Sequence, residues 1–451
     1  MKSWTPDRIA RESGAQLISP PPSDAGPERV TIDSRDAGPG ALFVGLPGAN
    51  VDGGAFAAQA LAAGAWGILT TLEHADQARC AAPGVLLAAE RPLAALQRLA
   101  AAWRTELGAE VVGITGSTGK TTTKDILLAL LATARRTVAS RANFNTEIGL
   151  PLEILAAPAG TEVLVLEHAM RGVGQIAELA AISQPDVAVI VNIGPVHLEM
   201  LGSLEAIAAT KSELIAALPA GGTAVIPSGE PLLEPHLRDD VEVIRFGADG
   251  EVRLERAEAE HIVIAAGAEK IELEFPFTQD HLRADLLAAV AAARATGVTP
   301  SGRVEVALSP ARGQRMELPG GITLIDDCYN ANPMSMRAAL DDLARTAEGA
   351  RTVAVLGDML ELGPDERDFH LQLGERADAT SVDVLVTVGP LAAAISERFD
   401  GDAYAVADAG EAAALVPELL APGDVVLIKG SRGVGLELVT EALVAAEDQW
   451  N

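Results

Sequence analysis

The chain of 451 residues is 49 % hydrophobic and carries a formal net charge of −29, and its length predicts about two to four domains. The negative charge argues against nucleic acid and anionic membrane surfaces as partners. The sequence shows neither an apolar run near the roughly 20 residues that cross a bilayer nor an apolar N-terminal leader. Its two cysteines, Cys80 and Cys328, lie too far apart to suggest a metal site or a disulfide framework. We therefore expect a cytoplasmic protein without integral membrane association.

The first segment, residues 1–107, alternates short strand-like runs with apolar helical patterns. The strand-like runs lie at 29–33, 41–46, 66–70 and 84–88, and the last helical pattern is "PLAALQRLAAAWRTEL". This alternation predicts a small α/β domain.

The second segment, residues 108–313, alternates strands and helices on a larger scale. Several of its runs are rich in Val, Leu and Ile, as expected of buried parallel strands. These runs are "EVVGIT", "TEVLVLEHA", "PDVAVIVNIG" and "GGTAVIPS", and the helical patterns are "KTTTKDILLALLATA", "SLEAIAATKSELIAAL" and "HLRADLLAAVAAARATG". Residues 241–277 alternate as antiparallel strands do. We predict a central domain built on a mainly parallel sheet.

The third segment, residues 314–451, is a further series of strands and helices. Its strand-like runs are "ITLIDD", "TVAVLGD", "VDVLVTVG", "DAYAVA" and "DVVLIKGS". An alternation of this length suits one doubly wound domain. The whole chain is therefore predicted to be an α/β protein of three domains.

The stretch "GITGSTGKTTTKD" (113–125) joins a strand-like run to a helical one and resembles a phosphate loop. The usual spacing requires glycine at 114, where this chain has Ile, so the pattern is T-G-x-x-G-K-T-T instead. A glycine-rich turn at a helix N-terminus still directs backbone N–H groups at phosphate. The nucleotide-binding residues predicted here are Thr115, Gly116, Ser117, Thr118, Gly119, Lys120 and Thr121. The alternative is an ordinary glycine-rich turn between a strand and a helix.

Lysine is scarce in the chain, with six lysines against 28 arginines. A lysine that persists against such a bias can mark a position where arginine fails chemically. Lys120 in the loop and Lys211 in "ATKSELIAAL" meet this description. For Lys211 the alternative is a solvent-facing helical side chain.

Two further candidates directly follow strand-like runs, where α/β sheets present functional groups. Glu167 closes "TEVLVLE", and His197 closes "VNIGPVH". Taken alone, Glu167 could be a solvated acid, and a lone histidine is more often a packed or surface residue.

Several motifs in chain order resemble the Mur ligase superfamily, and the resemblance covers nearly the whole chain. The T-G-x-x-G-K-T-T loop is the form used in that superfamily. The other matching segments are "IDSR", "GPGALFVGLPG", "DGGAFAAQALAAGA", "NFNTEIGLP" (143–151), "IDDCYNANPMSMRAAL" (325–340), "VAVLGDMLELG" (353–363) and "IKGSRGVGLE" (428–437). The Y-N-A-N-P block is similar to the branch that adds D-alanyl-D-alanine, whereas a sister branch carries D-N-P-R there.

The resemblance implies a three-domain architecture: an N-terminal domain that binds the UDP end of the substrate, a P-loop ATPase domain and a Rossmann-like C-terminal domain. It also implies an ATP-dependent ligase that uses Mg²⁺. Such an enzyme phosphorylates the terminal carboxylate of UDP-N-acetylmuramoyl-tripeptide, and the amine of D-alanyl-D-alanine attacks the acyl phosphate. The identity of the third peptide residue stays open, and we expect a monomer.

The family's functional residues map onto matching positions of this chain. The resemblance implies catalytic roles for Lys120, Glu167, His197 and Lys211. It implies metal contacts from Thr121, Glu167, His197 and Lys211, whose family counterpart is often carbamylated. Nucleotide contacts beyond the loop are expected from Asp326, Asn330 and Arg315, and substrate contacts from Ser34, Arg35, Asn145, Thr146 and Asn332. Lys429 and Arg432 are weaker anion-binding candidates, and Asp326 with Asp327 is alternatively a plain acidic pair at a strand end.

Three positions depart from the family pattern. His168 follows Glu167 where the family has methionine, and it is either an added metal ligand or, more in keeping with its neighbours, a packing residue. Thr146 replaces an asparagine of the N-N-E-I-G block. Asp285 replaces an asparagine expected near adenine, so that contact is not carried over.

Alternatives to this hypothesis remain open at the level of sequence. Another amide ligase of the superfamily is disfavoured by "IDSR" and by the Y-N-A-N-P block. A P-loop switch or motor would hydrolyse ATP without the acid and amine substrates, and the sequence lacks an apolar run closing in Asp-Glu. A non-catalytic relative would not be expected to retain Lys120, Glu167, His197 and Lys211.

Overall fold

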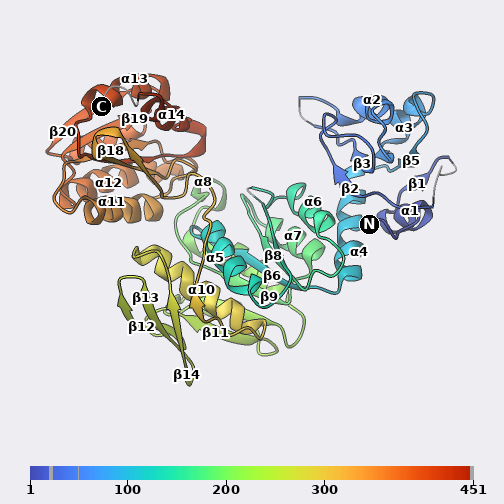
Figure 1. The fold of residues 1–451 in the computed structure, drawn as a ribbon, viewed down its shortest axis with the longest axis horizontal. Helices are drawn as coiled ribbons and strands as arrows, with labels where there is room; N and C mark the ends of the chain where they lie inside the picture. Colours follow the sequence, from blue (N-terminus) through green and yellow to red (C-terminus); the bar gives the residue numbers. More distant parts are fainter. Residues whose placement is uncertain (20–23, 49, 142, 447–451) are drawn as a thin grey trace.

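The computed structural model describes residues 1–19, 24–48, 50–141 and 143–446, which form three lobes that follow one another along the chain (Figure 1). The N-terminal lobe (blue) and the C-terminal lobe (orange to red) flank a central lobe (cyan to yellow). Each lobe is built around its own β-sheet. This arrangement confirms the predicted α/β fold class, with a largely parallel sheet at the centre.

The N-terminal lobe has a five-stranded sheet in the order β1-β5-β4-β3-β2, in which only β1 pairs antiparallel with its neighbour. Its strands are β1 (Gln16–Leu17), β2 (Arg29–Thr31), β3 (Ala41–Val44), β4 (Gly67–Thr70) and β5 (Val85–Ala88). Its helices are α1 (Pro6–Ser13), α2 (Ala57–Ala62), α3 (Leu72–Ala78) and α4 (Pro92–Leu107). Helix α4 packs against α1 and also against α6 and α7 of the central lobe. One continuous hydrophobic cluster therefore runs from Trp4 and Leu96 to Leu150 and Leu164.

The central lobe has a ten-stranded sheet in the order β15-β14-β13-β12-β11-β10-β9-β6-β8-β7. Its strands are β6 (Glu110–Thr115), β7 (Thr137–Ala139), β8 (Val163–Glu167), β9 (Val187–Ile190), β10 (Thr223–Pro227), β11 (Glu242–Phe246), β12 (Val252–Glu258), β13 (His261–Ala266), β14 (Glu269–Glu274) and β15 (Gly302–Arg303). Its helices are α5 (Lys120–Ala132), α6 (Gly149–Ala156), α7 (Gln175–Ser183), α8 (Leu198–Leu201), α9 (Leu204–Ala216) and α10 (Asp280–Ala295). The strands from β7 to β11 in this order are parallel, and β12 to β14 are antiparallel.

The C-terminal lobe has a six-stranded sheet in the order β16-β17-β21-β18-β19-β20. Its strands are β16 (Gln314–Leu318), β17 (Ile322–Asp326), β18 (Thr352–Gly357), β19 (Val384–Val388), β20 (Asp402–Val406) and β21 (Val425–Lys429). Its helices are α11 (Pro333–Ala347), α12 (Glu366–Ala379), α13 (Ala409–Leu419) and α14 (Glu437–Ala445). Two hydrophobic clusters, one on each face of this sheet, are made by residues of this lobe alone.

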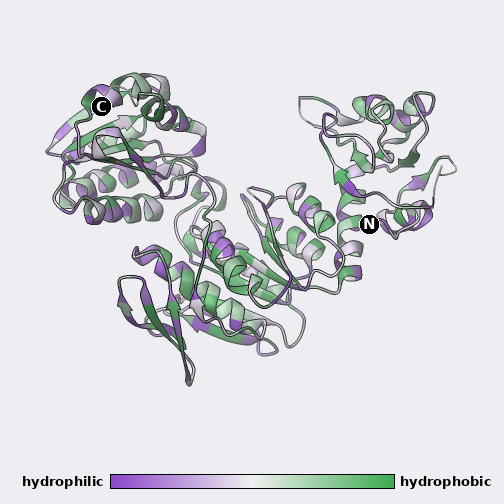
Figure 2. Cartoon of the chain, viewed as in Figure 1, coloured by the Kyte–Doolittle hydropathy of each residue, from purple (hydrophilic) through white to green (hydrophobic). Residues whose placement is uncertain are grey.

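The inner strands of the central sheet explain why this region folds around the loop at residue 115. Strands β8 and β9 are buried along their whole length and consist mainly of Val, Leu and Ile, and hydrophobic colouring follows the strands in Figure 2. Helices α5 and α10 contact each other and share one hydrophobic cluster with these strands. Burial on this scale is the main driving force that holds α5, and the loop before it, against the sheet.

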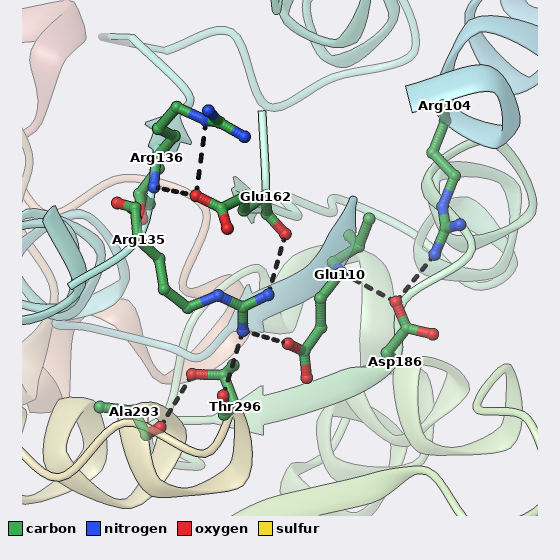
Figure 3. A network of polar contacts seen from close by, with 10 residues as sticks. Arg104, Glu110, Arg135, Arg136, Glu162, Asp186, Ala293 and Thr296 are labelled. Atoms are coloured by element: carbon green, nitrogen blue, oxygen red, sulfur yellow. Dashed lines mark hydrogen bonds and ion pairs between the residues drawn. The ribbon is translucent and has the colours of Figure 1, made fainter. Parts of the chain in front are cut away.

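A polar network closes the end of the central sheet opposite the loop (Figure 3). Arg135 donates to the Glu110 carboxylate at 2.6 Å and to the carbonyl of Thr296 at 3.1 Å. Asp186 accepts from the backbone N–H of Val111 and from Arg104, both at 2.8 Å. These contacts join α4, β6 and α10 at their ends, so the base of the sheet is fixed independently of the functional end.

The linker that leads to the C-terminal lobe is attached to α5. The backbone N–H and the hydroxyl of Ser309 both donate to the Asp125 carboxylate at 2.9 Å. Asp125 also pairs with Lys124 at 2.9 Å. The start of the linker is thus tied to the helix that follows the phosphate-type loop.

The long, strongly patterned elements agree well with the sequence expectation, and the short ones do not. Helix α4 and strand β6 match their predicted runs residue for residue. Strand β16 was not predicted, because the exposed run "QRMEL" shows little apolar alternation and is ordered by antiparallel pairing with β17. Among the described residues, no helix is both long enough and apolar enough to span a bilayer.

Candidate active site

The loop between β6 and α5 forms the floor of a large cavity between the central and C-terminal lobes. Gly119 has φ 74°, a left-handed conformation that glycine adopts without steric cost. A Cβ at Gly119 would collide with the carboxylate of Asp285 on α10. Helix α5 begins at Lys120, and the N–H groups of its first turn lack partners within the helix. This geometry is that of an anion site at a helix N-terminus.

Asn192, just after β9, fixes the first half of the loop. Its Oδ1 accepts the backbone N–H groups of Ser117 (3.1 Å) and Thr118 (2.9 Å). Ser117 Oγ in turn donates to the carbonyl of Gly194 at 2.9 Å. Two loop N–H groups are therefore used to hold the loop in shape, and the anion-binding donors are those at the start of α5.

Lys120 supplies the positive charge of the loop. Its Nζ donates to the carbonyl of Gly116 at 2.8 Å, which places the ammonium over the loop. Burial lowers the pKa of Lys120, and Arg312 adds to that effect, whereas Glu167 opposes it. Lys120 is half-buried, so water screens its charge from an approaching phosphate less than it would at an open surface.

Glu167, at the end of β8, is the most constrained carboxylate of the site. It is 2 % exposed; its Oε2 accepts from Thr121 Oγ1 at 2.7 Å and its Oε1 from Asn145 Nδ2 at 2.8 Å. Its backbone N–H donates to Ser140 Oγ at 3.1 Å. Within the described part of the chain Glu167 has neutral hydrogen-bond donors and no salt-bridge partner, and the nearest positive charge acting on it is the longer-range charge of Lys120.

Lys211, on α9, is buried with an exposure of 2 %. It has no hydrogen-bond or ion-pair partner among the described residues, although it lines the cavity. Burial lowers its pKa well below the usual value, and the charge of Lys120 lowers it further. Lys211 is therefore not a solvent-facing helical side chain, which was the alternative interpretation, because its side chain faces inward.

These groups fit a hard divalent cation. The hydroxyl of Thr121 and the carboxylate of Glu167 are oxygen donors of the kind that Mg²⁺ prefers, and Glu167 has no ion-pair partner among the described residues. The described residues contain no preformed cluster of three His, Cys, Asp or Glu side chains. Mg²⁺ usually takes only one or two carboxylates from a protein and fills its shell with phosphate oxygens and water.

The two histidines next to these groups have different surroundings. His168 is fully buried; its Nδ1 lies 3.0 Å from the carbonyl of Leu166 and its Nε2 2.9 Å from Ser183 Oγ. Burial lowers the pKa of His168 to about 4, and both ring nitrogens are engaged, which favours the packing role. His197 instead lines the cavity, and its Nδ1 contacts the Glu361 carboxylate of the C-terminal lobe.

The cavity has a volume of about 1270 Å³ and is lined by residues of the central and C-terminal lobes. The predicted residues that line it are Thr115, Gly116, Ser117, Thr118, Gly119, Lys120, Thr121, Asn145, Thr146, Glu167, His197, Lys211, Asn330, Asn332, Lys429 and Arg432. On the C-terminal side, Lys429 donates to Asp327 Oδ2 at 2.6 Å and to the carbonyl of Asn330 at 3.0 Å. Asn332 caps α11 by accepting the N–H of Ser335 at 3.0 Å.

Four predicted residues do not line this cavity. Asp326 lies on the other side of the chain from Asp327 and accepts the N–H of Cys328 at 3.2 Å. Arg315 points along the C-terminal lobe, where it pairs with Asp342 at 3.0 Å and donates to Thr346. Ser34 and Arg35 lie in the N-terminal lobe, and Arg35 is exposed and paired with Asp33 at 2.5 Å.

Arg312, three residues before Arg315, lines the cavity that Arg315 does not line. Its guanidinium lies 4.0 Å from the ring centroid of Tyr329, and that of Arg432 lies 5.5 Å from the same ring. All three residues line the cavity. Arg312 and Arg432 both add positive charge to the cavity that Lys120 lines. No carboxylate within the described residues forms a salt bridge with either arginine.

Sequence reasoning missed Asn192, Arg312 and Glu361 as site residues. Asn192 had a usable signal, because it follows a buried strand-like run as Glu167 does. Glu361 lies within the family-like segment 353–363 but was not singled out, and Arg312 had no signal, since both positions depend on how the C-terminal lobe rests on the central one.

Comparison with known proteins adds three matching family models in chain order. A Mur ligase family catalytic-domain model matches residues 28–104, the Mur ligase middle domain matches 114–293, and the Mur ligase glutamate ligase domain matches 311–432.

Relatives and solved structures match over nearly the full length. The UDP-N-acetylmuramoyl-tripeptide–D-alanyl-D-alanine ligase of Mycobacterium tuberculosis is 37 % identical, and the match covers 99 % of this chain and 98 % of the relative. The Bacillus subtilis protein of the same name is 36 % identical over 92 % and 93 %. The structure of MurF from Acinetobacter baumannii superposes with a TM-score of 0.86 at 28 % identity, covering 98 % and 99 %. That of the MurF ligase from Thermotoga maritima in complex with ADP has a TM-score of 0.80 at 30 % identity, covering 93 % and 98 %.

Proposed function

The chain belongs to the Mur ligase family, and we propose that within it the protein is the ATP-dependent ligase that joins D-alanyl-D-alanine to UDP-N-acetylmuramoyl-tripeptide in peptidoglycan precursor synthesis. The full-length similarity to ligases of that name carries this assignment. The cavity supports it, because the phosphate-type loop and the Y-N-A-N-P segment, about 210 residues apart in the chain, line the same space.

The geometry supports an acyl-phosphate reaction. ATP would place its terminal phosphates at the start of α5, where the free N–H groups and Lys120 neutralise charge. The tripeptide carboxylate would then attack the γ-phosphorus, with ADP leaving. The amine of D-alanyl-D-alanine attacks the acyl phosphate, forming the amide and releasing inorganic phosphate. Arg312 and Arg432 would supply further positive charge near two anionic reactants, the triphosphate and the tripeptide carboxylate.

Thr121 and Glu167 would hold Mg²⁺, with His197 and a carbamylated Lys211 completing its surroundings. The cation supplies charge neutralisation between triphosphate and carboxylate. The unpartnered, buried amine of Lys211 supports carbamylation, since a lowered pKa favours the neutral amine that reacts with carbon dioxide. Asn145 and Thr146 would face the peptide, and Ser34 with Arg35 the uridine diphosphate.

Other features of the proposal rest on family resemblance rather than on geometry. We propose a cytoplasmic monomer that acts on small-molecule substrates. Asp326 and Arg315, although outside the cavity here, would reach the nucleotide only if the C-terminal lobe shifts.

The test is an ATP-consumption assay with a panel of UDP-muramoyl tripeptides and D-alanyl-D-alanine. We expect phosphate release only when both substrates are present, and ¹⁸O from the tripeptide carboxylate in the released phosphate. ATP hydrolysis that proceeds when either substrate is omitted, or released phosphate without ¹⁸O, would refute the assignment.

The Lys211→Arg variant tests the proposed role of Lys211 in the same assay. Arginine keeps the positive charge but lacks the primary amine that a carbamate requires. We expect ligation to fall at least a hundredfold, and wild-type turnover would remove the proposed role of Lys211.

A further inference from the structure

The loop after β18 brings the C-terminal lobe into direct contact with His197. Glu361 in this loop contacts His197 Nδ1 with its carboxylate, and its carbonyl accepts the N–H of Glu199 at 3.3 Å. Its other oxygen lies 3.9 Å from Arg171. Glu361 therefore meets the turn at 197–199 with both its side chain and its backbone.

The two lobes lie close together around this contact. A Cβ at Gly363, two residues after Glu361, would lie 3.2 Å from the nitrogen of Glu199. Nearby, a Cβ at Gly194 would collide with the sulfur of Met334 on α11. The His197 turn is thus one side of a lobe–lobe contact in which two glycines permit the close approach.

Both partners adopt an unfavourable backbone conformation. Glu361 has φ 63° and His197 has φ 52°, whereas residues with a Cβ seldom occupy this left-handed region. Glycine at either place would relieve the strain. Strained residues that meet each other suggest that the strain is retained for function.

From these observations we propose that Glu361 is a positioning residue for His197, through which the docked C-terminal lobe fixes the imidazole that faces the nucleotide cavity. An imidazole that donates from Nδ1 to a carboxylate keeps the lone pair of Nε2 as an acceptor. Glu361 would thereby fix both the ring orientation and the tautomer. In the arrangement described here, with the two lobes in contact, His197 would already hold its working tautomer before substrates bind.

The first test reads the tautomer directly in the ligand-free protein. With ¹⁵N-labelled histidine at pH 8, the chain gives seven histidine signals, and His197 is assigned by its loss in His197→Gln. We expect protonation at Nδ1 in the wild type and loss of that preference in Glu361→Ala. An unchanged His197 signal in Glu361→Ala would overturn the proposal.

The second test separates positioning from folding, and it rests on the proposed ligase function. Glu361→Ala and Glu361→Gly should lose about 10- to 100-fold in kcat, the usual cost of removing a group that orients a functional histidine. KM for the UDP substrate should change less than twofold. Glu361→Gln, whose amide oxygen still accepts from Nδ1, should recover most of the loss.

Glu348 provides the matched control because it is also a left-handed glutamate, with φ 47°, but is an exposed residue at the end of α11. Glu348→Gly and Glu361→Gly should both keep or raise the unfolding temperature, and only Glu361→Gly should lose kcat. Equal loss of stability in Glu361→Ala and Glu361→Gln, or wild-type kcat in all variants, would refute the proposal. Failure of the wild type to ligate would refute the assigned reaction while the tautomer result still stands.

Discussion

At the scale of single residues, the site is marked by buried ionisable groups that form no salt bridge. Glu167, Lys211 and Asp285 are each at most 5 % exposed, and none forms a salt bridge within the described residues. Such groups are costly to bury as ions. An anionic substrate and its bound cation would bring opposite charges to these groups when they bind in the cavity.

Asp285 provides a prediction about pH. Burial raises its pKa well above the usual value, so the folded protein keeps a proton that the unfolded chain releases. The free energy of unfolding therefore falls as the pH rises above the ordinary aspartate pKa. Asp285→Asn removes this loss, and we expect it to stabilise the protein on the order of 2 kcal/mol at pH 8 and hardly at all near pH 4.

Denaturant unfolding at the two pH values checks this prediction. Asp280→Asn is the control, because Asp280 lies on the same helix with its side chain 86 % exposed. Asp280 pairs with Arg345 at 3.3 Å, and losing this exposed pair should cost at most about 1 kcal/mol at pH 8 and less at pH 4, without the gain in stability at pH 8 expected for Asp285→Asn. A pH-independent effect of Asp285→Asn would show that Asp285 is ionised in the folded protein.

At the scale of elements, the sequence predicted most where the pattern is long and periodic. Strand β6, the loop and α5 were placed correctly because a buried apolar run, a glycine turn and a helical pattern succeed one another. Glu167 and His197 were predicted as site residues because parallel strands present their ends at one edge of the sheet, and both line the cavity.

Other elements escaped prediction for physical reasons. The left-handed backbone at Glu361 has no sequence signal, since non-glycine residues rarely adopt it. Arg312 and Arg315 are three residues apart, and only the course of the linker and the pairing of β16 with β17 decide which one faces the cavity. Local sequence patterns do not predict tertiary contacts of this kind.

The start of α5 gives a prediction at this scale. Gly119→Ala adds a Cβ to a left-handed backbone and drives it against Asp285. We expect a loss of about 3 kcal/mol in unfolding free energy, combining the backbone cost with overpacking, together with weaker nucleotide binding.

Gly108→Ala is the matched control, because Gly108 has φ 59° at the end of α4 and nothing lies within 4 Å of the added Cβ. It should lose only the backbone share, about 1 kcal/mol, and bind nucleotide normally. Chemical denaturation and calorimetric titration with ADP measure both quantities, and equal losses in the two variants would contradict the clash with Asp285.

At the scale of the whole molecule, the lobes are joined unequally. The N-terminal lobe shares a continuous hydrophobic cluster with the central sheet through α4, whereas the C-terminal lobe has clusters of its own and meets the central lobe across the cavity. We therefore expect the C-terminal lobe to move when substrates bind.

Solution X-ray scattering tests this expectation. The radius of gyration should be larger for the free protein than for the protein with a non-hydrolysable ATP analogue and the UDP-linked tripeptide. The analogue alone serves as a partial control, because the bridging substrate is absent. Identical profiles in all three states would rule out closure.

The attachment of Ser309 to Asp125 has a mechanical consequence. Asp125 lies within the second turn of α5, whose first residue is Lys120. Helix α5 therefore connects the phosphate-type loop with the start of the linker to the C-terminal lobe. A small tilt of α5 on ligand binding would produce a much larger displacement at the far end of the C-terminal lobe. A ligand bound at the start of α5 would therefore act on the linker through Asp125, independently of any contact between the ligand and the C-terminal lobe.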